Sequence, residues 1–165
     1  METTNKRILE LNESLKVAFT QGDLNFKYLI KKNKVLLSSE TESLESIKKT
    51  IDDKLVDYNK ESMAIYQKYG KEKVVNGQQL LVIDKLDENG EETQNFINSQ
   101  LEFAKLNEDN QQLIDDCNAE YKEYSDLLLK EVDLDIKFID IPKAECPKNI
   151  TPNELEFLMD FEIIK

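Results

Sequence analysis

The sequence predicts an α+β fold that is mostly α: a long antiparallel helical hairpin with a small antiparallel β element and a short C-terminal helix. Residues 23–69 and 91–141 contain no Gly or Pro. Apolar residues recur in both blocks at the 3-4 spacing of an amphipathic helix. Between the blocks, Asn76-Gly77 separates two apolar runs, which is the typical signal of a β-hairpin with a type I′ turn.

The first long helix is expected over residues 24–69, after a shorter amphipathic segment that ends at Gly22. Its apolar side chains recur every seven residues, which is the spacing of a helix with one buried face. These side chains are Leu37, Leu44, Ile51, Tyr58 and Ile65. Ser38-Ser39 is the expected place of any interruption, and Gly70 is placed to end the helix.

The β-hairpin and a following turn are expected over residues 71–92, and the second long helix over residues 93–129. The apolar stripe of this second helix contains Phe103, Leu106 and Leu113. Asn110 lies within the stripe, and two interpretations stay open for it. It is either a buried Asn that fixes the register of the helix pair, or an exposed Asn at a curved seam.

Strict alternation of apolar and polar residues predicts a half-buried strand over residues 132–141, with residues 79–85 as its natural partner. The segment Thr151-Pro152-Asn153-Glu154 has the pattern of a capping box with Pro at the first helical position. It predicts a short helix over residues 152–164. Because no repeat or low-complexity segment divides the chain, residues 1–165 are expected to form a single domain.

The composition excludes several classes of chemistry. The chain has 165 residues, with 34 acidic and 22 basic side chains, a formal net charge of −12, and no His. It therefore has no Ser–His or Cys–His nucleophile pair and no imidazole metal site. Arg7 is the only arginine, which together with the acidic balance argues against direct binding to nucleic acid.

The two cysteines, Cys117 and Cys146, are too few for a structural zinc site, and Cys117 is expected to be a buried free thiol. No apolar run is long enough for a membrane span, so no membrane contact is expected. The expected location is the reducing cytoplasm.

One turn has half of the pattern of a calcium-binding loop. If Gly90, in Asp87-Glu88-Asn89-Gly90, were the sixth residue of such a loop, Lys85 and Phe96 would hold its first and twelfth positions, where carboxylates are required. The adjacent pairs Asp52-Asp53 and Asp115-Asp116 splay around a helix and do not converge as a catalytic pair does. We therefore expect no catalytic residue, no metal ligand and no cofactor, and the protein is expected not to be an enzyme.

The charges are unevenly distributed along the chain. Residues 84–126 hold thirteen acids and three bases, a net charge of −10, whereas residues 24–69 hold nine Lys and seven acids, a net charge of +2. Four of these Lys are clustered at positions 27, 31, 32 and 34. Either these charges only solvate the two segments and attract one segment to the other, or residues 84–126 offer an acidic face to a basic partner. The residues of this candidate face are Asp109, Asp115, Asp116, Glu120 and Glu123.

A second candidate surface is an apolar seam. A two-helix hairpin buries only one face of each helix, so apolar positions are left that need another surface. The leftover positions include Leu36, Tyr66, Phe96 and Phe103. They are covered either by the terminal helices or by a partner, and a partner is the favoured choice. The candidate seam residues are Leu37, Leu44, Ile51, Tyr58, Ile65, Phe103, Leu106 and Leu113.

The order of short motifs over about residues 9–164 resembles a known group of proteins. These motifs are Asn25-Phe26-Lys27-Tyr28-Leu29-Ile30-Lys31-Lys32-Asn33, Tyr66-Gln67-Lys68-Tyr69-Gly70, Asp87-Glu88-Asn89-Gly90, Glu131-Val132-Asp133-Leu134-Asp135-Ile136 and Ile150-Thr151-Pro152-Asn153-Glu154-Leu155. The pattern resembles a group of small acidic tailed-bacteriophage proteins of unassigned activity, encoded among virion-morphogenesis genes. The helix–hairpin–helix order is also similar to a prefoldin-type chaperone subunit, although the C-terminal strand and capped helix depart from it.

The resemblance implies a non-enzymatic viral protein, structural or active in virion assembly, that acts by protein–protein contact through a coiled-coil-like helical hairpin and an acidic face. Its expected partner is itself, as a homo-oligomer, or another virion protein. Its expected location is the cytoplasm of the bacterial host during assembly, with the virion as the second location. The alternative is a host-directed inhibitor, an anti-defence protein or nucleic-acid mimic, whose acidic segment blocks a basic cleft of a target.

Overall fold

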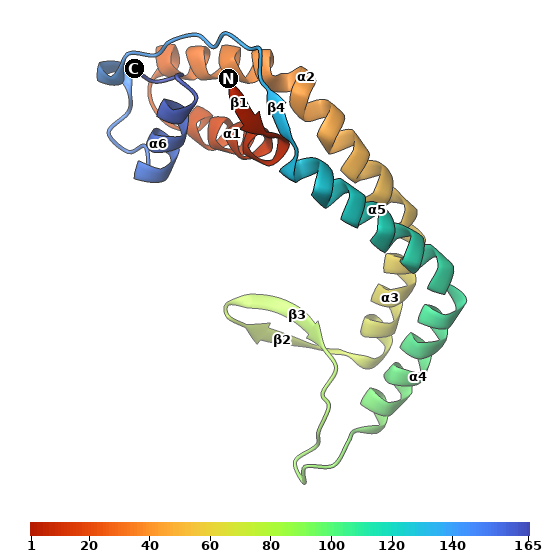
Figure 1. Ribbon diagram of the computed structural model, residues 1–165. Helices are drawn as coiled ribbons and strands as arrows, with labels where there is room; N and C mark the ends of the chain where they lie inside the picture. The colour runs from red at the N-terminus through yellow and green to blue at the C-terminus, as the bar shows by residue number, and fades with distance from the viewer. The chain divides into compact units, whose positions relative to one another are not determined.

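The computed structural model describes residues 1–165 and confirms a mostly-α α+β fold (Figure 1). The helices are α1 (Asn5–Phe19), α2 (Leu24–Lys54), α3 (Val56–Tyr69), α4 (Gln94–Asp109), α5 (Gln111–Leu129) and α6 (Pro152–Asp160). The strands are β1 (Glu2–Thr4), β2 (Lys71–Val75), β3 (Gln78–Val82) and β4 (Glu131–Asp133), and η1 (Lys143–Glu145) is a short 3₁₀ turn. The chain forms two compact units: unit 1 comprises Met1–Lys48 and Glu123–Lys165, and unit 2 comprises Lys49–Lys122.

Unit 1 contains the main hydrophobic core, which is built on α1, the first part of α2, and the C-terminal segment. Four apolar residues of α1, Ile8, Leu11, Leu15 and Ala18, lie at 3-4 spacing and are buried, as the periodicity of an amphipathic helix requires. Gly22 joins α1 to α2 with φ +72°, and a Cβ at this position would lie 2.7 Å from Cδ1 of Phe26. The core residues are Ile8, Leu11, Leu15, Ala18, Phe26, Ile30, Leu37, Leu134, Ile141, Leu158, Phe161, Ile163 and Ile164.

The C-terminal segment of unit 1 differs from the expectation of a strand over residues 132–141. Only Glu131–Asp133 forms a strand, and it pairs antiparallel with β1, whereas the expected partner residues 79–85 lie in unit 2, where β3 pairs with β2. The alternation of Leu134, Ile136 and Phe138 comes from an extended segment that places alternate side chains on the core without a ladder of hydrogen bonds. Alternation of apolar and polar residues indicates that one side of the segment is buried. It does not by itself indicate that the segment pairs with another strand.

The last helix begins as expected and ends earlier than expected. Thr151 and Glu154 form the predicted capping box, with Pro152 in the first turn. The helix ends at Asp160, because the backbone turns through Glu162 at φ 55° and directs Ile163 and Ile164 into the core. Ile141 then hydrogen-bonds on both sides of this end: its N–H donates to the Ile163 carbonyl at 2.7 Å, and its carbonyl accepts from Lys165 N at 3.1 Å.

Unit 2 contains the antiparallel pair α3 and α4. The Tyr69 hydroxyl donates to Glu102 at 2.8 Å and the Tyr58 hydroxyl donates to Asn107 at 2.8 Å, so the sequence numbers run in opposite directions along the pair. Ile65 and Leu106 are buried between the helices, and the rings of Tyr66 and Phe103 lie 5.2 Å apart.

Both long helices expected from the sequence are divided by a single residue. The helix over residues 24–69 breaks at Leu55, and Ser38-Ser39 stays inside α2 without an interruption. At the break the Leu55 N–H donates to the Asp52 carbonyl, three residues back, so the turn is locally tightened. The helix over residues 93–129 breaks at Asn110, which is half-buried and donates its side-chain amide to the Leu106 carbonyl at 2.9 Å. Asn110 therefore bonds to its own helix, a competition with the helical ladder that short polar side chains often cause.

The predicted hairpin is confirmed. The cross-strand pairs run from Lys71 with Val82 to Val75 with Gln78, around Asn76 at φ 52° and Gly77 at φ 80°. Positive φ at both central residues is the requirement of a type I′ turn.

Candidate interaction surfaces

The eight predicted seam residues lie mostly inside the protein. Leu37 and Leu44 are buried in unit 1, and Ile51, Ile65 and Leu106 are buried in unit 2, while the other three are half-buried. The half-buried residues are Tyr58, Phe103 and Leu113. The seven-residue spacing therefore identified the internal face of the helices, and a partner would have to contact other side chains.

The five predicted acidic residues are at or near the surface and differ in their bonds. Asp115 and Asp116 accept hydrogen bonds from Gln111 and Gln112, one helical turn back, at 2.9 and 2.8 Å. Glu120 is bound by Lys54 at 2.7 Å, and this hydrogen bond raises the pKa of the Lys54 ammonium. Asp109 and Glu123 are exposed and form no ion pair. Glu120 is therefore a structural member of unit 2, whereas the other four carboxylates are open to a partner.

An open groove of about 530 Å³ lies along α3 and α4 in unit 2. Ala64, Ile65 and Leu106 supply its apolar floor, and charged side chains surround them. The hydrogen bond from Lys68, followed by that from Tyr69, lowers the pKa of the Glu102 carboxyl on the groove wall. The charged residues of the groove are Glu61, Lys68, Glu102, Lys105 and Asp109.

The outer side of α2 in unit 1 combines exposed apolar residues with the lysine cluster. Leu24, Tyr28 and Val35 are 84%, 55% and 59% exposed. The lysines at positions 27, 31, 32 and 34 form no ion pair, and Lys32 instead lies over the Tyr28 ring at 4.6 Å. The lysine cluster is evident in the sequence. Leu24, Tyr28, Lys31 and Val35 have the same 4-3-4 spacing as a buried stripe, and only the structure distinguishes the two faces.

Most of the hairpin of unit 2 is exposed, and within its strands only Leu81 and Val82 of β3 are half-buried. Every residue of β2 is exposed, and Val74, at 70% exposure, is the most exposed apolar side chain of the hairpin. Lys73 forms the one ion pair of the hairpin, with Asp84. A two-stranded hairpin with so little covering is marginally stable by itself.

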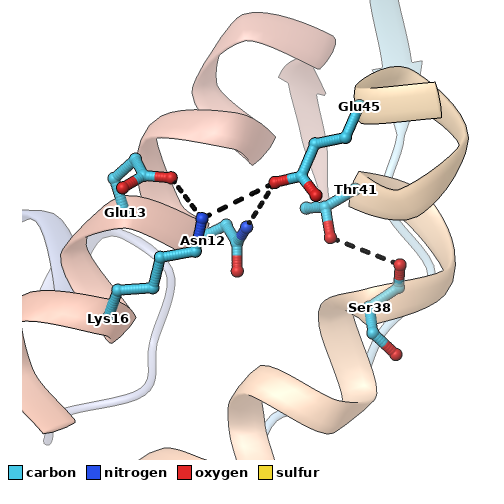
Figure 2. A network of polar contacts seen from close by, with 6 residues as sticks. All are labelled: Asn12, Glu13, Lys16, Ser38, Thr41 and Glu45. Atoms are coloured by element: carbon cyan, nitrogen blue, oxygen red, sulfur yellow. Dashed lines mark hydrogen bonds and ion pairs between the residues drawn. The ribbon is translucent and has the colours of Figure 1, made fainter. Parts of the chain in front are cut away.

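Two polar residues of α1 that no sequence pattern indicated bind an exposed residue of α2. Figure 2 shows Asn12 and Lys16 of α1 pointing toward Glu45 of α2. The Asn12 amide donates to Glu45 at 3.1 Å, and Lys16 lies 3.6 Å from the same oxygen. Lys16 also bonds Glu13, which is the main cause of the raised pKa of its ammonium. Asn12 is buried and Glu45 is exposed, so this contact joins α1 to α2 at the edge of the core.

Asp87 shows that the candidate calcium loop is an ordinary turn. Its carboxylate accepts from the backbone N–H groups of Asn89 at 2.8 Å and Glu91 at 3.0 Å, and these bonds lower its pKa. No group of His, Cys, Asp or Glu residues in the chain is arranged to hold a metal ion. Cys117 is a buried free thiol, as expected. None of the helices is both long and apolar enough to cross a membrane.

Comparisons with protein-family models, curated proteins and solved structures found no match. The inference about function therefore depends on the surfaces of this chain itself.

Proposed function

We propose that this protein is a non-enzymatic structural or assembly protein that acts by protein–protein contact, either with further copies of itself or with another virion component. The proposal depends mainly on the exposure of large apolar side chains on the helices of both units. Leu24 in unit 1 is 84% exposed, and Leu101 in unit 2 is 67% exposed. Apolar side chains grouped with charged ones at a surface are typical of a binding site for another protein.

The phage-type role is the part of the proposal that comes from the sequence resemblance. The helical hairpin of unit 2 and the open carboxylates beside it fit a protein that presents long surfaces to partners. The proposed location is the host cytoplasm during assembly, or the virion.

The experiment measures molar mass by light scattering over a range of concentrations, alone and after mixing with purified capsid, portal or tail proteins. We expect the mass to rise with concentration, or a complex with one of these proteins. The L24S/L101S variant should reduce either association, because both side chains are at the surface and their removal leaves the cores unchanged. The matched control is V74S, which removes an equally exposed apolar side chain from the hairpin. A monodisperse monomer that binds none of these proteins would contradict the proposal.

A second candidate, the host-directed inhibitor, is favoured by a different observation. Of the thirteen carboxylates in residues 84–126, only Asp84, Glu92, Glu102 and Glu120 form an ion pair with a lysine. The other nine form no ion pair, although Asp87, Asp115 and Asp116 accept hydrogen bonds within the chain, and their charge is available to a basic cleft.

Charge reversal separates the two candidates. The variant should reverse Asp109, Asp115, Asp116 and Glu123 and keep Glu120, because Glu120 pairs with Lys54 within unit 2. An inhibitor should lose its binding to a basic target enzyme in this variant, and in wild type at high salt. Association through apolar residues should depend much less on salt.

A further inference from the structure

The first half of α2 has a face that is both apolar and basic, and nothing in unit 1 covers it. Leu24, Tyr28, Lys31 and Val35 follow 4-3-4 spacing and therefore lie on one stripe of the helix. The opposite stripe, which contains Phe26, Ile30, Asn33 and Leu37, is fully buried. The name α2 face is used below for Leu24, Tyr28 and Val35 together with Lys27, Lys31, Lys32 and Lys34.

The α2 face concentrates positive charge in a chain whose net charge is −12. No acid lies between Asp23 and Glu40 in the sequence, so the four lysines give this part of the helix a charge of +4. None of them forms an ion pair. The face therefore fits a partner that is acidic and that also offers apolar side chains.

Unit 2 of the same chain has a surface of this kind on the outer side of α4. Ile97, Leu101, Ala104 and Glu108 repeat the 4-3-4 spacing of the α2 stripe, and Leu101 is 67% exposed. The inner side of α4, with Ser99 and Leu106, is buried. The name α4 face is used for these four outer residues together with Asp109, which lies at the edge of the face toward the groove of α3 and α4.

The charges around the α4 face are mainly negative. Glu108 and Asp109 are exposed and without ion pairs, and Asp115 and Asp116 follow at the start of α5. Lys105 is the only base on α4. Two helices with apolar stripes of equal spacing and opposite charges can pack side by side.

We propose that the α2 face of one copy docks on the α4 face of a second copy. This inference rests on the proposed function and names the partner surface. A second copy is the chosen occupant because its α4 face matches the α2 face in both charge and apolar spacing, and because every copy supplies both surfaces. The contact is heterologous, so a pair of copies keeps one free α2 face and one free α4 face, and assembly continues until a ring closes or a filament forms.

The test uses two charge-reversed variants of the full chain, K31E/K32E and E108K/D109K. In the first variant the net charge of the α2 face falls from +4 to 0, and in the second the α4 face becomes basic like the α2 face. Each variant alone should associate about tenfold or more weakly than wild type, and an equimolar mixture of the two should associate again, because opposite charges then meet. Wild-type association should also weaken when salt rises from about 0.05 M to about 0.5 M.

The control variant is K143E/K148E, which makes the same change in net charge at two exposed lysines without ion pairs. It should associate as wild type does. Circular dichroism checks that each variant keeps its helix content.

Several outcomes would overturn the inference. If K31E/K32E forms the same oligomers as wild type, or if the mixture fails to restore association, the docking is wrong while the proposed function stands. If wild type is a monomer that binds a virion protein, the docking between copies is wrong and the proposed function still stands. If K31E/K32E abolishes binding to duplex DNA or to phosphatidylglycerol vesicles and wild type does not self-associate, the α2 face has another anionic partner. If wild type is a monomer that binds none of the tested proteins, the docking between copies and the proposed function are both wrong.

Discussion

Asn33 connects two segments of unit 1 that have no regular pairing with each other. Its side chain is fully buried, donates to the Ile139 carbonyl at 2.9 Å and accepts from Ile139 N at 2.7 Å. The extended segment after β4 has no neighbouring strand at this point, so one amide satisfies both backbone groups of a residue that would otherwise lack partners. In the sequence Asn33 lies among lysines, yet the 4-3-4 spacing of Phe26, Ile30, Asn33 and Leu37 places it on the buried stripe.

We predict that N33A lowers the free energy of unfolding by about 2–3 kcal/mol, because it leaves buried backbone groups of Ile139 without partners. Urea unfolding followed by circular dichroism measures the change. N25A is the matched control, since Asn25 is on the same helix, exposed, and bonds only Glu145 at 3.1 Å. The control should change stability by less than about 0.5 kcal/mol. If N33A and N25A lower the free energy of unfolding equally, the buried hydrogen bonds of Asn33 contribute no more than the exposed one of Asn25.

At the scale of elements, the sequence predicted which sides of the helices are buried better than where the helices end. The spacing of Leu37, Leu44, Ile51 and Ile65 marks buried residues on both sides of the break at Leu55. A break of a single residue keeps the phase of the repeat, so the periodicity does not reveal it. The pairing of β1 with β4 was also missed, because Glu2-Thr3-Thr4 is short and polar and its partner is far away in the sequence.

The candidate surfaces follow the same division. Exposure of the acidic residues was predictable, because charged residues on helices normally face water. The apolar seam was assigned to a partner because spacing alone cannot tell an internal stripe from an external one. Leu24, Tyr28 and Val35 have the spacing of a core and are exposed, and this distinction requires the position of every other element of unit 1.

We predict that the hairpin of β2 and β3 opens far more easily than the helices of unit 2. Amide protons in its cross-strand bonds should exchange with solvent about a hundredfold or more faster than those of α4 near Leu106. The reason is that β2 is exposed along its whole length, while Leu106 is buried. Hydrogen exchange followed by mass spectrometry in dilute protein makes the comparison. Equal protection of hairpin and helix would show that the hairpin is covered.

At the scale of the whole molecule, charge bears on association more than on folding. Ten of the twelve surplus negative charges lie in residues 84–126, whereas four lysines without acids begin α2. The ion pairs within the chain are at the surface, as between Lys54 and Glu120, and such pairs contribute little to stability. The uneven distribution therefore has its largest effect on which surfaces of two molecules can meet.

The same charges predict a stability that barely changes with pH near neutrality. The chain has no His, the side chain that normally titrates there. The hydrogen bond from Lys68 lowers the pKa of Glu102. The ionised Glu102 therefore adds to the free energy of unfolding in full above the usual Glu range, and this stabilisation is lost as the pH falls through the lowered pKa. The same bond raises the pKa of Lys68. The stabilisation from the protonated Lys68 is therefore complete below the usual Lys range and is lost as the pH rises through the raised pKa.

Burial likewise raises the pKa of the Cys146 thiol. Deprotonation of this thiol therefore lowers the free energy of unfolding only at alkaline pH. The urea midpoint should therefore be nearly constant from about pH 5.5 to about pH 7.5 and should fall outside this window. E102Q should flatten the acidic fall, and E88Q, at an exposed position without an ion pair, is the control. A steady slope of the midpoint across neutral pH would contradict this account, because a group that titrates there would then have to change its pKa on folding.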